Sequence, residues 1–474
     1  MDKSSAAAGG LKLNYKRTTI IGFAFFGILL LWQVYDLWCP PFLTELFKDA
    51  FSVTDESKVQ YLVGIMMAID NLAALILLPV FGRLSDRTHT KIGKRMPYIL
   101  VGTFVCAVAF PFIPIFFHYK KVAGVVVMML VVLVFAMMYR NPAVALMPDM
   151  TPKPLRSKAN GLINIMGYIG GAFATVVGMV FVLSQYLGTQ ADKPKTWAYN
   201  NVWAVEAPFL IASVLMLFSA FVLFLNVKEN AVAEEVKDDL ARGEELSEAA
   251  DKIAPDDEKP LSRANKIMLW LILGAEFFWF MADNGVSTFL NNYIIYGLNA
   301  SSVSTSMLTI IGGVGSVIGF IVGGIIAEKI SRKRTVVCGL ALTLISYAVW
   351  AALTFAVGLK DGSLPIWLLA LWLVKGFGMS LVHVNSYPMV VELCSSKKIG
   401  AFTGYYYASS MTAQTITPVL LGLLWLAPSF DWYLLPVYAG VCVTVSLVVF
   451  VFIKNVKTSK TEFKRGLAAL DGDD

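Results

Sequence analysis

Charged residues are scarce in this chain, and their scarcity excludes an ordinary soluble protein. They make up 15% of the 474 residues, whereas a typical soluble domain carries roughly 25%. Apolar residues make up 57%, and the mean hydropathy is +0.66. A single core cannot hide that much apolar surface from water, but a lipid bilayer accepts it directly. The composition therefore predicts an integral membrane protein.

Cysteines are few, and the common catalytic signatures are missing. The five cysteines lie within or at the ends of apolar runs, with no CxxC spacing: Cys39, Cys106, Cys338, Cys394 and Cys442. We therefore expect neither a disulfide framework nor a metal site. HExxH, GxSxG and GxxxxGK[ST] are absent, so we expect no enzymatic activity and no cofactor. The 17 mostly polar residues before the first apolar run contain no cleavage site, so we expect no signal peptide.

Long apolar runs, in contrast, are abundant. A helix needs about 20 apolar residues to cross the hydrocarbon core, and twelve runs reach that length. They are 18–39, 59–81, 98–117, 122–148, 158–184, 203–225, 266–290, 304–328, 335–357, 366–392, 399–425 and 432–453. We predict an all-α membrane protein whose twelve transmembrane helices form two six-helix bundles, 18–225 and 266–453. A polar linker, 226–265, joins the bundles, and the tails 1–17 and 454–474 flank them.

The placement of lysine and arginine predicts the orientation. With a cytoplasmic N-terminus, the loops and tails on that side hold 30 of these residues, and the opposite loops hold seven. Such a bias marks the cytoplasmic side, so we expect a monomeric, multi-pass protein of the cell (inner or plasma) membrane with both termini in the cytoplasm. Basic residues confined to short loops do not indicate nucleic-acid binding. The linker carries twelve acidic residues; we expect it to be solvated, with an amphipathic surface helix as the alternative.

The two halves carry related landmarks. In each half a glycine precedes an acid by four positions, and a second acid precedes a glycine by twelve. The matching positions, at offsets of 242 or 243, are Gly82 and Gly324, Asp86 and Glu328, Asp149 and Glu392, and Gly161 and Gly404. Two landmarks at nearly one offset indicate duplication of a six-span unit. We therefore expect two pseudo-symmetric bundles with a solute site between them near mid-membrane.

Two blocks of the sequence resemble a known family. Residues 82–95, GRLSDRTHTKIGKR, resemble the loop motif of the major facilitator superfamily. The closer resemblance is to the sucrose transporters and the related glycoside–pentoside–hexuronide:cation symporters. It rests on this first block with the following MPYI and on a second block at 140–161, RNPAVALMPDMTPKPLRSKANG. The resemblance implies the major facilitator fold and cation-coupled sugar transport. The arginine that the sucrose transporters carry before A-L-x-x-D is Val144 here, and whether Arg140 replaces it is open.

Polar side chains inside the apolar runs are candidate binding residues, because a bilayer tolerates them only where they face a cavity or a partner. Trp32 and Asp36 share a helical face, which suits a sugar, because the ring packs on C–H groups and the carboxylate accepts hydroxyls. Amide side chains both donate and accept hydrogen bonds. The predicted substrate-binding residues are Trp32, Gln33, Tyr35, Asp36, Asn71, Asn164, Tyr168, Asn284, Asn291 and Gln414.

Ionisable groups within the spans are candidates for proton or ion coupling. They are Asp36, Asp70, Arg140, Glu276, Asp283, Lys375 and His383. Because a buried arginine requires a carboxylate partner, we expect Arg140 to pair with one of the two acids in its own half. Lys375 is expected to neutralise Glu276 or Asp283. The run Asp283-Asn284-Gly285 suggests a break in its helix.

Charges at the helix ends on the linker side are candidate gating residues, since a pair formed there in one conformation can break in the other. They are Asp86, Arg87, Arg95, Asp149, Arg156, Glu328, Arg332 and Glu392. We expect Asp149 to pair with Arg156 or Lys158, and Glu392 to pair with Lys397 or Lys398.

These observations predict a secondary transporter that works by alternating access. We expect proton-coupled symport of a sucrose- or maltose-like glycoside, with H⁺ or else Na⁺ as the coupling ion. One alternative is a proton-coupled antiporter that exports an amphipathic compound, which predicts an apolar cavity with few amides. A membrane sensor is a remote alternative, because the short tail 454–474 offers no signalling domain.

Overall fold

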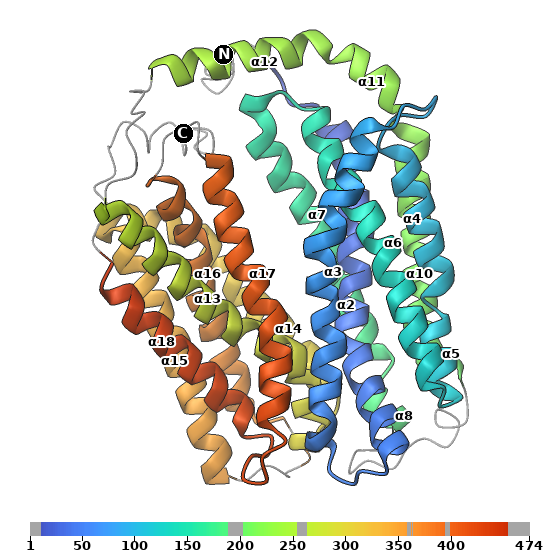
Figure 1. The fold of residues 1–474 in the computed structure, drawn as a ribbon, viewed down its shortest axis with the longest axis vertical. Helices are drawn as coiled ribbons and strands as arrows, with labels where there is room; N and C mark the ends of the chain where they lie inside the picture. Colours follow the sequence, from blue (N-terminus) through green and yellow to red (C-terminus); the bar gives the residue numbers. More distant parts are fainter. Residues whose placement is uncertain are drawn as a thin grey trace.

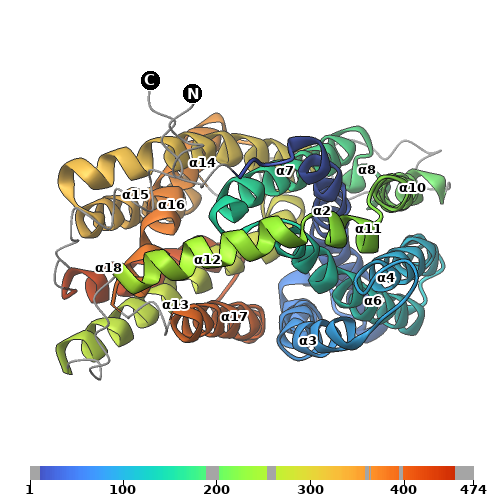
Figure 2. The ribbon, with the colours of Figure 1, turned by 90° about the horizontal axis from the view of Figure 1, so that it is seen from above.

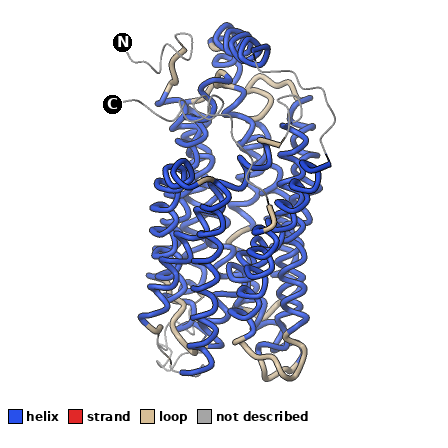
Figure 3. Tube along the Cα trace, turned by 90° about the vertical axis from the view of Figure 1, so that its left-hand side faces the viewer, coloured by secondary structure: helices blue, strands red, loops and turns tan. Residues whose placement is uncertain are grey.

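The computed structural model describes residues 11–187, 202–253, 263–357, 362, 364–393 and 399–453. Within those ranges the regular elements are helices, joined by turns and short loops (Figure 3). Eleven of the described helices are long and apolar enough to cross a membrane. The all-α membrane fold expected from the sequence is therefore confirmed.

The twelfth expected span is less apolar than the others. α17 (Ile399–Leu424) is a helix of 26 residues, but it does not reach the apolarity of the other eleven. Its middle carries the polar run YYYASSMTAQT. α17 packs closely against α3 (Gln60–Arg87) of the other half. Contact with protein on that side removes the need for a fully apolar surface.

The N-terminal half contains the helices of the first six spans (Figure 1). Besides α3 they are α2 (Tyr15–Phe51), α4 (Met96–Ala109), α5 (Phe112–His118), α6 (Val122–Asp149), α7 (Arg156–Val180), α8 (Leu183–Leu187) and α10 (Trp203–Asn226). Two short helical turns, η1 (Glu56–Val59) and η2 (Lys153–Leu155), connect them. α4 and α5 form one span, interrupted beside Pro111, which has no N–H to continue the ladder.

The C-terminal half contains the remaining spans. Besides α17 they are α13 (Arg263–Asn292), α14 (Val303–Ile330), α15 (Arg332–Val357), α16 (Ile366–Val391) and α18 (Leu434–Val451). The expected break at Asp283-Asn284-Gly285 is wrong, because α13 continues through these residues. The irregular turn comes later, in the π-helical segment η3 (Tyr293–Gly297).

The described part of the linker is helical, and it lies against the N-terminal half. α11 (Glu229–Glu235) and α12 (Lys237–Ile253) run from the N-terminal half across to the C-terminal half (Figure 2). Arg17 pairs with Glu235 at 3.3 Å, and Leu246 packs on Leu11 and Leu155. The described part of the linker thus forms the surface helix that was the alternative, and most of its described side chains are exposed. We call the end of the molecule that carries α11 and α12 the linker end, and the end that carries η1 the opposite end.

Candidate functional site

A cavity of about 530 Å³ lies between the two halves. α2, α3 and α6 line it from one side, and α13, α14, α16 and α17 line it from the other. Its volume is within the range of about 300–1,000 Å³ that is typical of small-molecule sites. Eleven predicted site residues line it: Trp32, Gln33, Asp36, Asp70, Asn71, Arg140, Asp283, Asn284, Asn291, Lys375 and Gln414.

Two acids from the N-terminal half meet at this cavity in different settings. Asp36 is exposed to it, whereas Asp70 is only 9% exposed. The Tyr35 hydroxyl donates to Asp70 Oδ1 at 3.1 Å. Tyr35 is itself 2% exposed and is not among the lining residues, so it holds Asp70 in place rather than contacting a substrate. Asp36 is therefore the carboxyl group of this half that a ligand or a proton reaches most easily.

The C-terminal half contributes an ion pair. Lys375 Nζ in α16 donates to Asp283 Oδ1 in α13 at 2.6 Å. Of the two acids that the sequence offered to Lys375, the structure brings Asp283 to it. His383, farther along α16, lies close enough to interact electrostatically with both charges. A pair at the cavity wall whose members sit on different helices couples the positions of those helices.

Arg140 faces the same cavity without the carboxylate partner that the sequence led us to expect. Within the described part of the chain, no acidic side chain lies within the 4.0 Å that defines an ion pair with it. Neither Asp36 nor Asp70 pairs with it, and the hydrogen bond described for Asp70 comes from Tyr35.

Four further predicted residues lie away from the cavity. Glu276 is fully buried in the C-terminal half, and its carboxyl oxygens have no hydrogen-bond partner in the described residues. Since a bare buried charge would be destabilising by several kcal/mol, we expect Glu276 to be neutral in this conformation. Asn164, Tyr168 and His383 are also absent from the lining, and Tyr168 is 67% exposed.

Trp372 is a lining residue that the sequence reasoning missed. It comes from α16 and is 5% exposed, whereas Trp32 enters the lining from α2 in the other half. The cavity thus presents one indole from each half. The signal that could have found Trp372 is Lys375, three residues farther along and on the same helical face, as Asp36 is for Trp32.

A buried polar network closes the opposite end beyond the cavity. The Asn292 amide in α13 donates to the Thr44 hydroxyl at 2.9 Å and to Gln60 Oε1 at 2.8 Å. All three residues are 0% exposed, and most buried polar groups in proteins are hydrogen-bonded. Because these bonds cross between the halves, opening this end must break them.

Two prolines in α2 create another contact between the halves. Pro40 and Pro41 have no N–H, so the carbonyls of Asp36 and Leu37, four residues earlier, lose their helical partners. Asn291 Nδ2 in α13 donates to the Leu37 carbonyl at 2.5 Å. The C-terminal half therefore satisfies a group that the sequence of α2 leaves free.

Lys58 joins the two halves at the edge of the opposite end. Its ammonium donates to the carbonyls of Trp425 at 2.8 Å and of Ala427 and Phe430 at 3.2 Å each. These carbonyls follow the C-terminus of α17, where helical partners are missing and the helix dipole attracts a cation. The hydrogen bonds described between the halves all lie either at the cavity or between the cavity and the opposite end. Toward the linker end the helices of the two halves diverge (Figure 1).

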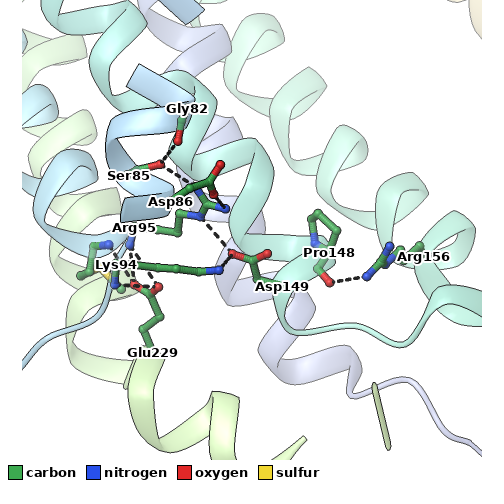
Figure 4. Close-up of polar contacts among 10 residues, drawn as sticks. Gly82, Ser85, Asp86, Lys94, Arg95, Pro148, Asp149, Arg156 and Glu229 are labelled. Carbon is green, nitrogen blue, oxygen red and sulfur yellow. Dashed lines mark hydrogen bonds and ion pairs between the residues drawn. The ribbon is translucent and has the colours of Figure 1, made fainter. Parts of the chain in front are cut away.

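Three of the predicted gating residues of the N-terminal half, Asp86, Arg95 and Asp149, form one cluster at the linker end (Figure 4). Arg95 pairs with Asp86 at 2.5 Å and with Asp149 at 2.9 Å, and Lys94 pairs with Asp149 at 3.0 Å. Burial lowers the pKa of Arg95, but the hydrogen bond and charge of Asp149, together with Asp86, raise it above its ordinary value overall. The cluster ties the loop between α3 and α4 to the end of α6.

The expected pairing of Asp149 with Arg156 is wrong. Arg156 donates to the main-chain carbonyls of Pro148 at 2.9 Å and Thr151 at 3.1 Å (Figure 4). The end of α6 leaves such carbonyls without helical partners, and Arg95 already occupies Asp149.

In the C-terminal half, Glu392 pairs with Arg332. Its predicted partners Lys397 and Lys398 lie outside the described residues. Arg87 and Glu328 are exposed, so their predicted gating role has no contact to support it in this conformation.

Comparison with known proteins identifies the family. Residues 20–417 match the family model described as MFS/sugar transport protein. The chain belongs to this family. Among curated proteins, none matches the sequence.

Several solved structures share the fold. The POT family transporter PepTSo superposes with a TM-score of 0.65 at 14% identity, covering 93% of this chain and 98% of its own. The inward-open xylose transporter XylE from E. coli gives 0.63 at 14% identity, with 95% and 99% covered. An inward-facing bacterial homologue of the iron transporter ferroportin gives 0.63 at 13% identity, with 93% and 99% covered. Identities this low show the fold alone.

The family and the fold together define the broad activity. The chain is a multi-pass membrane transporter of the major facilitator type, which moves a small molecule and is not an enzyme. The cavity between the halves is where a transporter of this fold holds its solute.

Proposed function

We propose that this transporter carries a sugar, together with protons, by alternating access. The observation that carries the proposal is the composition of the cavity lining. It combines one indole from each half with a set of amides and an accessible carboxyl group: Trp32, Trp372, Gln33, Asn71, Asn284, Asn291, Gln414 and Asp36. Indole faces suit the C–H surfaces of a sugar, and amides match hydroxyl groups, which also donate and accept.

The charge distribution supports an assignment of the two ends. We assign the linker end to the cytoplasm, because 30 lysine and arginine residues lie on that side against seven on the other. The contacts at the opposite end then close the outer side, and the conformation is inward-open. Sugar and proton would be released from this state into the cytoplasm.

Asp36 is the proposed proton carrier. It is exposed to the cavity, and it forms no ion pair within the described part of the chain. When the cavity closes around it, a charged Asp36 without a partner disfavours the occluded state. Protonation removes that penalty, so that reorientation follows the loading of both sugar and proton.

Transport by purified protein in proteoliposomes tests this proposal. Labelled sucrose, maltose and related glycosides are offered under a pH gradient or a sodium gradient, imposed separately. We expect accumulation driven by the pH gradient in the wild type. Asp36→Asn should retain exchange of sugar between the two sides and lose accumulation. Asp49→Asn, the same change on the same helix in an exposed pair with Lys120, serves as the control. Normal accumulation by Asp36→Asn would remove Asp36 from this role.

The same vesicles distinguish the antiporter. An exporter that exchanges its substrate for protons accumulates substrate when the pH gradient is reversed. The lining described above is rich in amides, which is contrary to the apolar cavity expected for an amphipathic compound.

A further inference from the structure

Glu229 is buried at 5% exposure although it belongs to the acidic linker. Its carboxylate accepts hydrogen bonds from the main-chain N–H groups of Lys94, Arg95 and Met96, at 2.9–3.0 Å (Figure 4). α4 begins at these residues, where N–H groups have no helical partners and the helix dipole attracts negative charge. Glu229 therefore caps α4, although it lies 133 to 135 residues farther along the chain than the N–H groups that it binds.

The loop before α4 is shaped to receive this carboxylate. Gly93 has a φ of +120°, a conformation that favours glycine. A Cβ atom at the same position would also clash with the Glu229 carboxylate. The next linker residue, Asn230, donates to the carbonyls of Thr90 at 2.9 Å and Lys91 at 3.0 Å. Two consecutive linker residues thus hold both the N–H and the carbonyl groups of one loop.

This loop also carries Arg95, whose side chain binds Asp86 and Asp149. The main chain of Arg95 is therefore fixed by the linker, and its side chain by α3 and α6. α12 then leaves this anchor, passes Pro152 and Lys153 at Gly243, and continues over the boundary between the halves (Figure 2). The hydrogen bonds, the ion pair and the leucine packing described above join the linker helices to the N-terminal half.

We propose that Glu229 anchors the linker to the N-terminal half, so that α12 stays with that half and lies over the boundary while the C-terminal half moves beneath it. Glu229 acts through Arg95 and α4, and is a positioning residue rather than part of the binding site. The inference rests on the transporter fold and requires no particular substrate or coupling ion.

Distances between spin labels on the full chain in nanodiscs test the proposal without a substrate. One label replaces Ala241 on α12, and its partner replaces Tyr119 of the N-terminal half or Ile366 of the C-terminal half, all of which are exposed. Cys338, which is exposed, and Cys394 are changed to serine. We expect one narrow distance between positions 241 and 119 in the wild type. In Glu229→Gln the distribution should become at least twice as broad, because the neutral amide holds the three N–H groups less strongly.

Two further variants keep the test decisive. Gly93→Ala displaces the carboxylate without removing its charge, so it should broaden the same distribution even if Glu229→Gln fails to fold. Glu234→Gln, on the same helix with a side chain 78% exposed, should leave it unchanged. An unaltered narrow distribution in folded Glu229→Gln or Gly93→Ala would overturn the proposal. Lys58→Met, which loosens the opposite end, gives a second refuting outcome. If the distance from 241 to 119 changes in that variant while the distance from 241 to 366 stays fixed, α12 moves with the C-terminal half and the proposal is wrong.

Discussion

Replacing Lys58 with methionine should shift the transporter toward the conformation whose opposite end is open. The ammonium of Lys58 donates to three carbonyls of the C-terminal half, at 2.8, 3.2 and 3.2 Å. One hydrogen bond to a charged group contributes about 1.5–3 kcal/mol. The three bonds share one ammonium whose side chain is still 26% exposed, so solvent weakens them, and we take about 2 kcal/mol for the set. That free energy corresponds to a change of about 30-fold in the equilibrium between the two conformations.

The assay is the distance between labels on the two halves at the opposite end, at Tyr119→Cys and Ile366→Cys in the background without Cys338 and Cys394. We expect Lys58→Met to add or enlarge a population at longer distance. Lys48→Met is the matched control. The side chain of Lys48 is 27% exposed, and its described ion pairs, with Glu45 and Glu56, lie within the N-terminal half.

A distribution that is the same in Lys58→Met and the wild type would refute the reasoning, because the three contacts would then contribute nothing to the closed end. An equal change in Lys48→Met would also refute it. In that case the loss of any positive charge at this surface would explain the effect, rather than the contact with the end of α17.

Three further changes test other parts of the structure. Asp283→Asn should lower the free energy of unfolding by about 2 kcal/mol. The loss is smaller than for a fully buried pair, because the Asp283 side chain is 34% exposed. In thermal unfolding, the double variant with Lys375→Met should recover most of the lost stability. Gly64→Ala should favour the conformation with the opposite end open in the same label assay, because the new Cβ overlaps a carbonyl of α17, whereas Gly171→Ala, with nothing within 4 Å, should not. Glu276→Gln should leave the apparent Tm almost unchanged, because we expect the buried carboxyl to be neutral already. A rise of several degrees would show that Glu276 is charged, because the neutral amide would then remove an unpaired buried charge.

The polar residues inside the spans were the most informative signal in the sequence. Asp36, Asp283 and Lys375 stand out because each interrupts an apolar run, and all three line the cavity. The same signal failed for Glu276, which is buried away from the cavity. The position of a residue within its apolar run predicts its depth in the membrane. The direction in which its side chain points depends on which helices surround it.

The sequence alone could not assign partners. Arg140 was expected to pair with an acid of its own half, yet Asp70 is bonded to Tyr35. Asp149 was expected to pair with Arg156, which is close in sequence, yet Arg95 binds it from the neighbouring loop. Which side chain meets a given acid depends on how the helices and loops pack against one another, and that packing is invisible along one chain.

The membrane fold and its succession of apolar spans were determined by the sequence itself, and the repeated landmarks predict two related halves. Those features follow from local quantities, namely the length of each apolar run and the spacing of repeated landmarks. The tertiary structure alone decided that Lys58 meets the end of α17 and that Asn292 meets Gln60, 367 and 232 residues apart. It also decided that Glu229 caps α4. Such contacts depend on how separate helices pack against one another, and their partners share no pattern that neighbouring residues could reveal.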